Sequence, residues 1–175
     1  MSIELRDARR SAGDREWLTN VYPFYLHDLS EFDLTYYTLN DRGVWMPDHR
    51  AGWLEEDDDH PLILVEGGRR VGFALVNQAP SPHMRPGMDY RMSEFFVLRK
   101  HRGLGIGRRA VFALFDRFRG KWEISELPRN AAAISFWRRV IGEYGGGRHE
   151  ETTDERGVTQ VIDTTGSTSA SSPPA

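Results

Sequence analysis

The sequence contains no cysteine, and this absence excludes several kinds of chemistry together. Disulfides, zinc ribbons, iron–sulfur clusters and a thiol nucleophile all require cysteine, so a covalent intermediate would have to form on another side chain. None of the six histidines lies at metal-ligand spacing from another histidine. We therefore expect no metal site.

Long hydrophobic runs are also missing. No apolar stretch approaches the length of a membrane span, and the first ten residues mix charged with apolar side chains, which is not typical of a secretion signal. These features predict a cytoplasmic protein without a membrane partner.

The net charge is small, at −3, but it is unevenly distributed along the chain. Residues 31–59 carry nine acidic side chains against two arginines, whereas residues 91–121 carry nine basic side chains against two acids. Opposed blocks of this kind favour binding of a polyanion at one place and a cation at another. Plain solvated surface would give the same pattern, and we favour that interpretation for residues 55–59.

The length of 175 residues suits one domain. Residues 164–175 have no large apolar side chain and no charge, so they cannot offset the entropy lost on ordering. We therefore expect one folded domain over residues 1–163 and a disordered tail over residues 164–175.

The pattern in the first half of the chain predicts one helix, with one strand before it and a hairpin of two strands after it. Helical spacing of apolar residues covers 13–29, where Pro23 is expected to kink or divide the helix. Short helices and loops are expected over 30–60, where glycine and proline interrupt an acidic, aromatic segment. Strands are expected at 2–8, and at 62–66 and 71–77, which form a hairpin closed by glycines.

The second half predicts strands and helices in alternation. Residues 90–98 form a strand that is apolar on both faces near its end, as a central strand is. Helical spacing follows from Ile106 until Gly120, and again over 130–141. Shorter strands are expected at 121–125, 148–153 and 157–163.

The turn between the strand at 90–98 and the next helix carries the chemistry. Three glycines alternate in the run Arg102-Gly103-Leu104-Gly105-Ile106-Gly107, which Arg108 and Arg109 follow. Glycines let main-chain N–H groups point inward, and the positive end of a helix adds to the field, so the natural occupant is a phosphate. The Walker pattern is absent because Gly107 is not followed by lysine, and the turn comes too late for a dinucleotide fold.

The order of elements and two motifs resemble the GNAT N-acetyltransferase superfamily. The first is the run from Val97 through Arg102 to Gly107, which is similar to its coenzyme A signature. The second is the run from Asn130 to Gly142, where the family commonly has Asn, a small residue, Phe, Tyr and a closing Gly. The resemblance implies an α/β, three-layer fold: a mixed, mostly antiparallel sheet with splayed central strands, flanked by helices.

The resemblance also implies a binding mode for acetyl-CoA as co-substrate. The main chain of Phe96, Val97 and Leu98 would pair with the pantetheine arm, and one N–H there would polarise the thioester carbonyl. Asn130 would contact the same arm, and Phe136 is expected to pack. The pyrophosphate would be held by the turn formed by Arg102, Gly103, Leu104, Gly105, Ile106, Gly107 and Arg108.

Glu94 is the candidate general base. It lies three residues before Val97, where the family often has an acid used as a base directly or through water. Its apolar neighbours in sequence favour a raised pKa, which suits a base that works near neutrality. A structural acid paired with Arg91 or Arg99 is an equal alternative.

Trp137 departs from the family pattern, which commonly has Tyr there as the acid beside the coenzyme sulfur. An indole N–H can donate a hydrogen bond but does not release its proton at useful pH. The thiolate would then leave unprotonated, take a proton from water, or use a displaced group such as Tyr144. Core packing is the simpler role for Trp137.

The acceptor pocket is expected near His27, Asp28, Glu31 and Asp33. Tyrosines 22, 25, 36 and 37 surround this cluster in the sequence, so carboxylates and aromatic walls together suit an ammonium group. A helix that packs its aromatic face gives the same pattern.

The sequence therefore predicts an acyltransferase that moves an acetyl group from acetyl-CoA to a primary amine of a small molecule or peptide amino terminus. Direct attack in a ternary complex is expected because no cysteine can form an acyl-enzyme. One alternative is a module that binds coenzyme A without turnover. Another, which we disfavour because no reading motif accompanies the arginines, is an RNA-binding domain. The sequence leaves open whether the active form is a homodimer.

Overall fold

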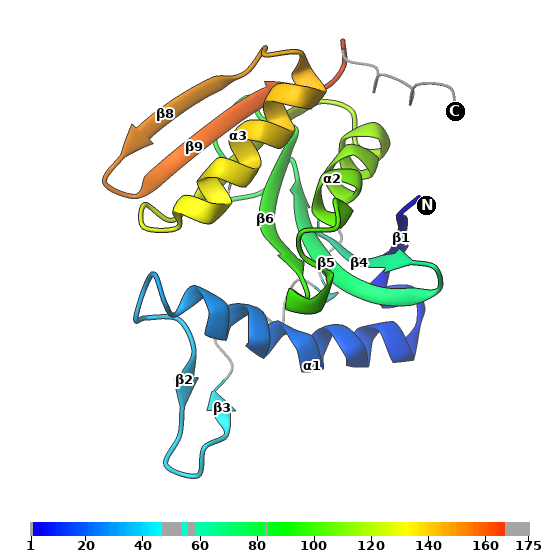
Figure 1. Ribbon diagram of the computed structural model, residues 1–175, viewed down its shortest axis with the longest axis vertical. Coiled ribbons are helices and arrows are strands. Elements are labelled where there is room, and N and C mark those ends of the chain that lie inside the picture. The colour runs from blue at the N-terminus through cyan, green and yellow to red at the C-terminus, as the bar shows by residue number, and fades with distance from the viewer. Residues whose placement is uncertain (1, 47–53, 56–58, 83, 167–175) are drawn as a thin grey trace.

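The computed structural model describes residues 2–46, 54–55, 59–82 and 84–166. A seven-stranded sheet runs through the domain, and Figure 1 shows helices on both of its faces. The strands follow the order β1-β4-β5-β6-β7-β9-β8, and only the β6–β7 pair is parallel. Their bounds are β1 (Glu4–Asp7), β4 (Asp59–Glu66), β5 (Arg69–Gln78), β6 (Tyr90–Val97), β7 (Lys121–Glu126), β8 (Glu150–Asp154) and β9 (Gly157–Asp163).

Two hydrophobic clusters define the three layers. Helix α1 (Ala12–Leu29) packs against one face of the sheet, where Leu18 and Leu26 meet Phe73 and Phe96. Helices α2 (Ile106–Arg117) and α3 (Ala131–Gly145) pack against the other face. This is the predicted three-layer fold with a mostly antiparallel sheet.

Pro23 does not divide the first helix, because α1 continues from Ala12 to Leu29. Buried side chains lie on both sides of the proline, with Leu18 before it and Leu26 after it. Since both halves pack against the same sheet face, burial outweighs the one main-chain hydrogen bond that proline removes.

The segment after α1 differs from its prediction. A small hairpin, β2 (Thr38–Leu39) with β3 (Trp45–Met46), projects from the body of the domain beyond α1 (Figure 1). Strand β4 also starts earlier than expected, at Asp59, which is buried and accepts a hydrogen bond from Asn77. The solvated interpretation is therefore wrong for Asp59; Glu55 is exposed, and residues 56–58 lie outside the described residues.

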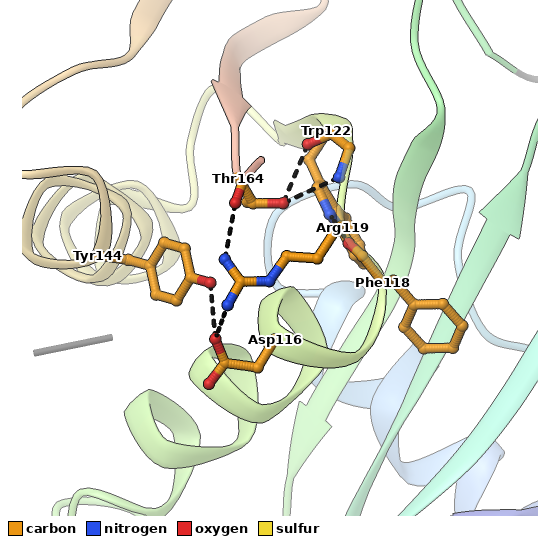
Figure 2. A network of polar contacts seen from close by, with 7 residues as sticks. Asp116, Phe118, Arg119, Trp122, Tyr144 and Thr164 are labelled. Atoms are coloured by element: carbon orange, nitrogen blue, oxygen red, sulfur yellow. Dashed lines mark hydrogen bonds and ion pairs between the residues drawn. The ribbon is translucent and has the colours of Figure 1, made fainter. Parts of the chain in front are cut away.

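Thr164 is the first residue of the predicted tail, but it is fully buried. Its hydroxyl accepts from the Gly120 N–H at 3.0 Å and donates to the Gly120 carbonyl at 3.1 Å. Figure 2 shows how Arg119 continues this network, reaching the Thr164 carbonyl at 2.7 Å and Asp116 at 2.8 Å. The folded part therefore extends to Thr164, because polar bonds replace the apolar contacts that its sequence lacks. Residues 167–175 lie outside the described residues.

Thr164→Val is expected to lower the free energy of unfolding by about 1–3 kcal/mol, because the buried Gly120 N–H loses its acceptor. Urea denaturation measures the loss. The matched control is Thr165→Val. The Thr165 hydroxyl bonds the exposed Asp163, so its loss should leave the free energy of unfolding nearly unchanged. Equal stability of both variants would contradict the anchoring role.

Candidate active site

A cleft opens where β6 and β7 separate. The two strands pair in parallel from Tyr90–Trp122 to Met92–Ile124 and no further along the described strands. Beyond that point lies a cleft of about 870 Å³. The side chains in its walls that matter below are Tyr25, Tyr36, Glu94, Glu126, Asn130 and Trp137.

A β-bulge in β6 directs the predicted base into this cleft. Glu94 pairs with Leu75 and Met92 with Val76, so Ser93 has no partner on β5. One extra residue changes which sheet face each side chain points to. As a result, Met92 lies in the α2–α3 core, whereas Glu94 shares the α1 face with Leu75.

The partner of Glu94 on that face is Tyr25 of α1, whose hydroxyl donates a hydrogen bond to the Glu94 carboxylate. Glu94 is 6% exposed. Burial and the adjacent Glu94 carboxylate raise the pKa of Tyr25 well above its usual range, so the phenol keeps its proton and stays a donor. The sequence grouped Tyr25 only with the acceptor cluster and did not identify this contact.

The glycine-rich turn presents main-chain donors, as predicted. Gly103 and Gly105 have φ angles of 75° and 71°, a left-handed conformation that favours glycine. Across the described part of the chain, the amides of residues 103–108 donate to no other protein group. Gly107 is close to Phe136, since an added Cβ would lie 3.1 Å from that ring. The start of α2 therefore has open N–H groups, an arrangement that suits an anion.

The arginines of this turn have protein partners. Arg102 donates to the Val97 carbonyl and to Asp28, each at 2.8 Å, and lies over the Phe96 ring. Arg108 pairs with Glu143. Both guanidinium groups therefore fasten the turn to its neighbours, and their contact with a pyrophosphate stays a prediction.

The main-chain prediction for β6 also needs correction. Leu98 donates its N–H to the Val71 carbonyl at 3.0 Å. Because antiparallel pairs alternate, the N–H and C=O of Phe96 also face β5, while those of Phe95 and Val97 face the open side. Phe96 and Leu98 are thus engaged in the sheet. The Val97 N–H remains on the open side, and its carbonyl accepts from Arg102.

Asn130 and Trp137 both line the cleft. The side-chain oxygen of Asn130 accepts from the Ala133 N–H at 3.1 Å and caps α3, which leaves its NH₂ group as the donor available to a ligand. Trp137 is 5% exposed and packs edge-on against Phe95 and Phe136. Trp137 therefore contributes an aromatic wall to the cleft.

Tyr144 does not replace the missing phenol. Its hydroxyl donates to Asp116 at 2.8 Å, on the side of α3 that faces α2 (Figure 2), and it does not line the cleft. Burial and the bonded Asp116 raise the pKa of Tyr144 far above its usual value. The proposed use of Tyr144 as an acid is therefore wrong.

The acceptor cluster is only partly assembled. Tyr25 and Tyr36 line the cleft, but Asp28 is bonded by Arg99 at 2.9 Å and by Arg102 at 2.8 Å. Although burial acts in the opposite direction, these two hydrogen bonds hold the pKa of Asp28 below its usual value. Asp28 therefore ties α1 to the anion turn. Tyr22 is buried in the core, Tyr37 contacts His27, Asp33 accepts from Thr35, and Glu31 is exposed.

Glu126 is the functional candidate that sequence reasoning missed. It is the last residue of β7, is 6% exposed, and neither carboxyl oxygen has a hydrogen-bond partner among the described residues. Burial and the nearby Glu151 raise its pKa to about 8. Along β7, Trp122 and Ile124 are every second residue and point to the core. Glu126 is the next residue on that side, so an acid at a position expected to be buried was the sequence signal that could have identified it.

No metal site is found where the structure is described, since no three His, Asp or Glu side chains there are grouped to hold an ion. Within those same residues, no helix is both long and apolar enough to cross a membrane.

Glu126→Gln is expected to stabilise the protein at pH 8–9 by a few kcal/mol, at about 1.4 kcal/mol per pKa unit. The folded protein holds the Glu126 proton up to about pH 8, whereas an ordinary glutamate releases it near 4.5. Folding therefore binds a proton between these values, and wild-type stability falls as the pH rises through them.

Thermal and urea unfolding at pH 4.5 and pH 8.5 measure this difference. The advantage of the variant should disappear at the lower pH, and the exposed Glu155→Gln should show none at either. An equal effect of both substitutions at pH 8.5 would contradict the buried, protonated state.

Comparison with known proteins supports the fold and shows the family. No curated protein matches the sequence. An acetyltransferase from Thermus thermophilus has a similar structure, at 17% identity and a TM-score of 0.59, covering 93% of this chain and 97% of that one. The ribosomal-protein-S18-alanine N-acetyltransferase of Escherichia coli is similar at 11% identity and a TM-score of 0.55, covering 93% of this chain and 94% of that one.

AAC(6')-Ib, solved with paromomycin and acetyl-CoA, is similar at 18% identity and a TM-score of 0.59, covering 93% of this chain and 94% of that one. At these identities the likeness concerns the fold. The sequence profile of the acetyltransferase (GNAT) family matches residues 22–142, which include both motifs and most of the residues in the walls of the cleft. This chain belongs to the acetyltransferase (GNAT) family and is an acyltransferase.

Proposed function

We propose that this protein transfers an acetyl group from acetyl-CoA to a primary amine of a small molecule or of a peptide amino terminus. One observation carries the proposal: a buried carboxylate, Glu94, lies in the cleft, and the strand that carries it, β6, leads directly into an open run of main-chain donors at residues 103–108. A base and an anion site on one strand–turn–helix unit fit a phosphate-bearing acyl donor attacked by an amine.

Acetyl-CoA fits the donors present. Its diphosphate would accept from the amides of residues 103–108 at the positive end of α2. The pantetheine arm would lie between the separated strands, within reach of the Val97 N–H and the Asn130 amide. AAC(6')-Ib, which has a similar fold, was solved with acetyl-CoA.

Two steps of the transfer have a candidate group on β6. Glu94 accepts the proton of the attacking amine, and the Tyr25 hydroxyl holds the carboxylate in place. The Val97 N–H, on the open side of β6, donates to the oxyanion of the tetrahedral intermediate. Attack occurs in a ternary complex because the chain has no cysteine to carry the acyl group.

A module that binds coenzyme A without turnover is the second candidate. The observation that favours it is Trp137, which gives an aromatic wall where the family commonly has an acid. The RNA-binding alternative loses support because Arg99, Arg102, Arg108 and Arg109 are paired with carboxylates. The cytoplasmic location and the homodimer stay predictions from the sequence.

Glu94→Gln is expected to lower kcat for amine-dependent thiol release by about 100-fold, because the amine loses its proton acceptor. The affinity for coenzyme A, measured by calorimetry, should stay within about twofold, since Glu94 does not belong to the anion turn. An amine panel with acetyl-CoA and a thiol reagent gives the rates. An undiminished rate would remove Glu94 from the base role, and a wild-type protein that binds coenzyme A without thiol release would favour the second candidate.

Gly105→Glu is expected to abolish binding of coenzyme A, because a carboxylate would face the diphosphate at the start of α2. The control is Gly43→Glu, which places the same side chain at nearly the same φ angle, 72° against 71°, in the β2–β3 turn. Both variants carry similar backbone strain, so only the first should lose affinity in calorimetry. Unchanged affinity of the folded Gly105→Glu protein would contradict the placement of the cofactor.

A further inference from the structure

Glu94 and Glu126 occupy equivalent positions on the two walls of the cleft. The parallel pairing of β6 and β7 ends at Met92–Ile124, and each glutamate lies two residues beyond that pair. The bulge at Ser93 turns Glu94 toward α1, whereas Glu126 continues the side of β7 that carries Trp122 and Ile124 toward α2 and α3. A group inserted between the strands would therefore have one carboxyl on each side.

The two carboxyl groups have different surroundings. Glu94 receives a hydrogen bond from Tyr25, which compensates a negative charge. Glu126 receives none from the described residues, although it is 94% buried. An ionised carboxylate without donors in such a place is costly, so Glu126 is the neutral, proton-carrying member of the pair.

Burial and the nearby Glu151 raise the pKa of Glu126, whereas the Arg138 guanidinium lowers it, and the raising effects prevail. Arg138 of α3 donates to Glu151 of β8 at 2.8 and 2.6 Å, and Gln160 of β9 donates to the same carboxylate at 2.9 Å. These hydrogen bonds lower the pKa of Glu151 to about 2 and leave it ionised near Glu126. Arg138 and Gln160, which could have donated to Glu126, thus donate to Glu151 instead. The other charged side chains in the walls nearby are Glu123, which is paired with Arg85, and Asp154 and Arg156 of the β8–β9 turn.

We propose that Glu126 is the general acid that protonates the coenzyme A sulfur when the thioester breaks. The proposal rests on the acetyltransferase function proposed above. It supplies the proton donor that Trp137 cannot provide, from the opposite side of the cleft to the base. Different surroundings for two carboxyl groups are the usual way in which one site holds both an acid and a base.

The proton balance closes with these two residues. The amine nitrogen forms a bond to the acetyl carbon, and its proton passes to Glu94. The carbon–sulfur bond then breaks, the electron pair goes to sulfur, and the Glu126 proton passes to the thiolate to give free coenzyme A. Glu94 is left protonated and Glu126 ionised, so transfer of one proton from Glu94 to Glu126, through water that enters after product release, restores the starting state.

The test compares wild type, Glu126→Gln and the exposed control Glu155→Gln in amine-dependent thiol release. Glu126→Gln should lower kcat by about 100-fold, while KM for the amine and the affinity for coenzyme A stay within about twofold. The control should match wild type. A rise in the amine KM with kcat unchanged would overturn the proposal, because it would make Glu126 a binding group.

The pH dependence distinguishes an acid from a structural residue. Because titration of the amine affects both proteins alike, the ratio of wild-type to Glu126→Gln rates isolates Glu126. This ratio should be highest below pH 8 and should fall as the pH rises, since wild type loses its proton donor there. A ratio that does not change with pH would overturn the acid role.

A readout without turnover separates this proposal from the proposed function. Infrared spectra of wild type at pH 6.5 should contain the carbonyl band of a protonated, buried carboxylic acid, which fades through about pH 8 and is missing from Glu126→Gln. Absence of the band overturns the acid role even if thiol release is fast. Presence of the band without any amine-dependent thiol release would overturn the acid role together with the acetyltransferase function.

Discussion

The separation of β6 from β7 is the constraint on which the site depends. Two parallel strands that continued side by side would satisfy each other's main-chain groups and close the sheet. Here the pairing stops after Met92–Ile124, and the extra residue Ser93 turns Glu94 to the opposite face from Met92. The end of the pairing therefore leaves the Val97 N–H without a β7 partner, and the bulge directs a carboxylate toward Tyr25.

Ion pairing neutralises much of the strongly basic segment around the glycine-rich turn. Asp28, Glu66 and Glu143 come from three distant elements and neutralise arginines around the anion turn. The turn is thereby held against α1, β4 and α3, and its main-chain N–H groups are left for the ligand. Recognition by fixed amides favours a phosphate group of defined position over a general polyanion.

The sequence predicted what depends on local pattern. The strand, glycine turn and helix of residues 90–117 follow from hydrophobic periodicity and from glycine at positive φ, and the resemblance to the family pointed to Glu94, which the structure places in the cleft. The roles of Arg102 and Arg108 could not be predicted, since their partners Asp28 and Glu143 lie 74 and 35 residues away. Glu126 was missed because its meaning depends on burial beneath α3, and Thr164 because two hydrogen bonds to Gly120 hold it.

Hydrogen–deuterium exchange in the presence and absence of coenzyme A tests the central claim most directly. The account predicts that the ligand slows exchange of the amides at residues 103–108 and of Val97, with little change in the β2–β3 hairpin. The amides of residues 103–108 have no main-chain acceptor among the described residues, so a ligand that accepts from them should slow their exchange. Unchanged exchange at 103–108 under saturating coenzyme A would contradict the account.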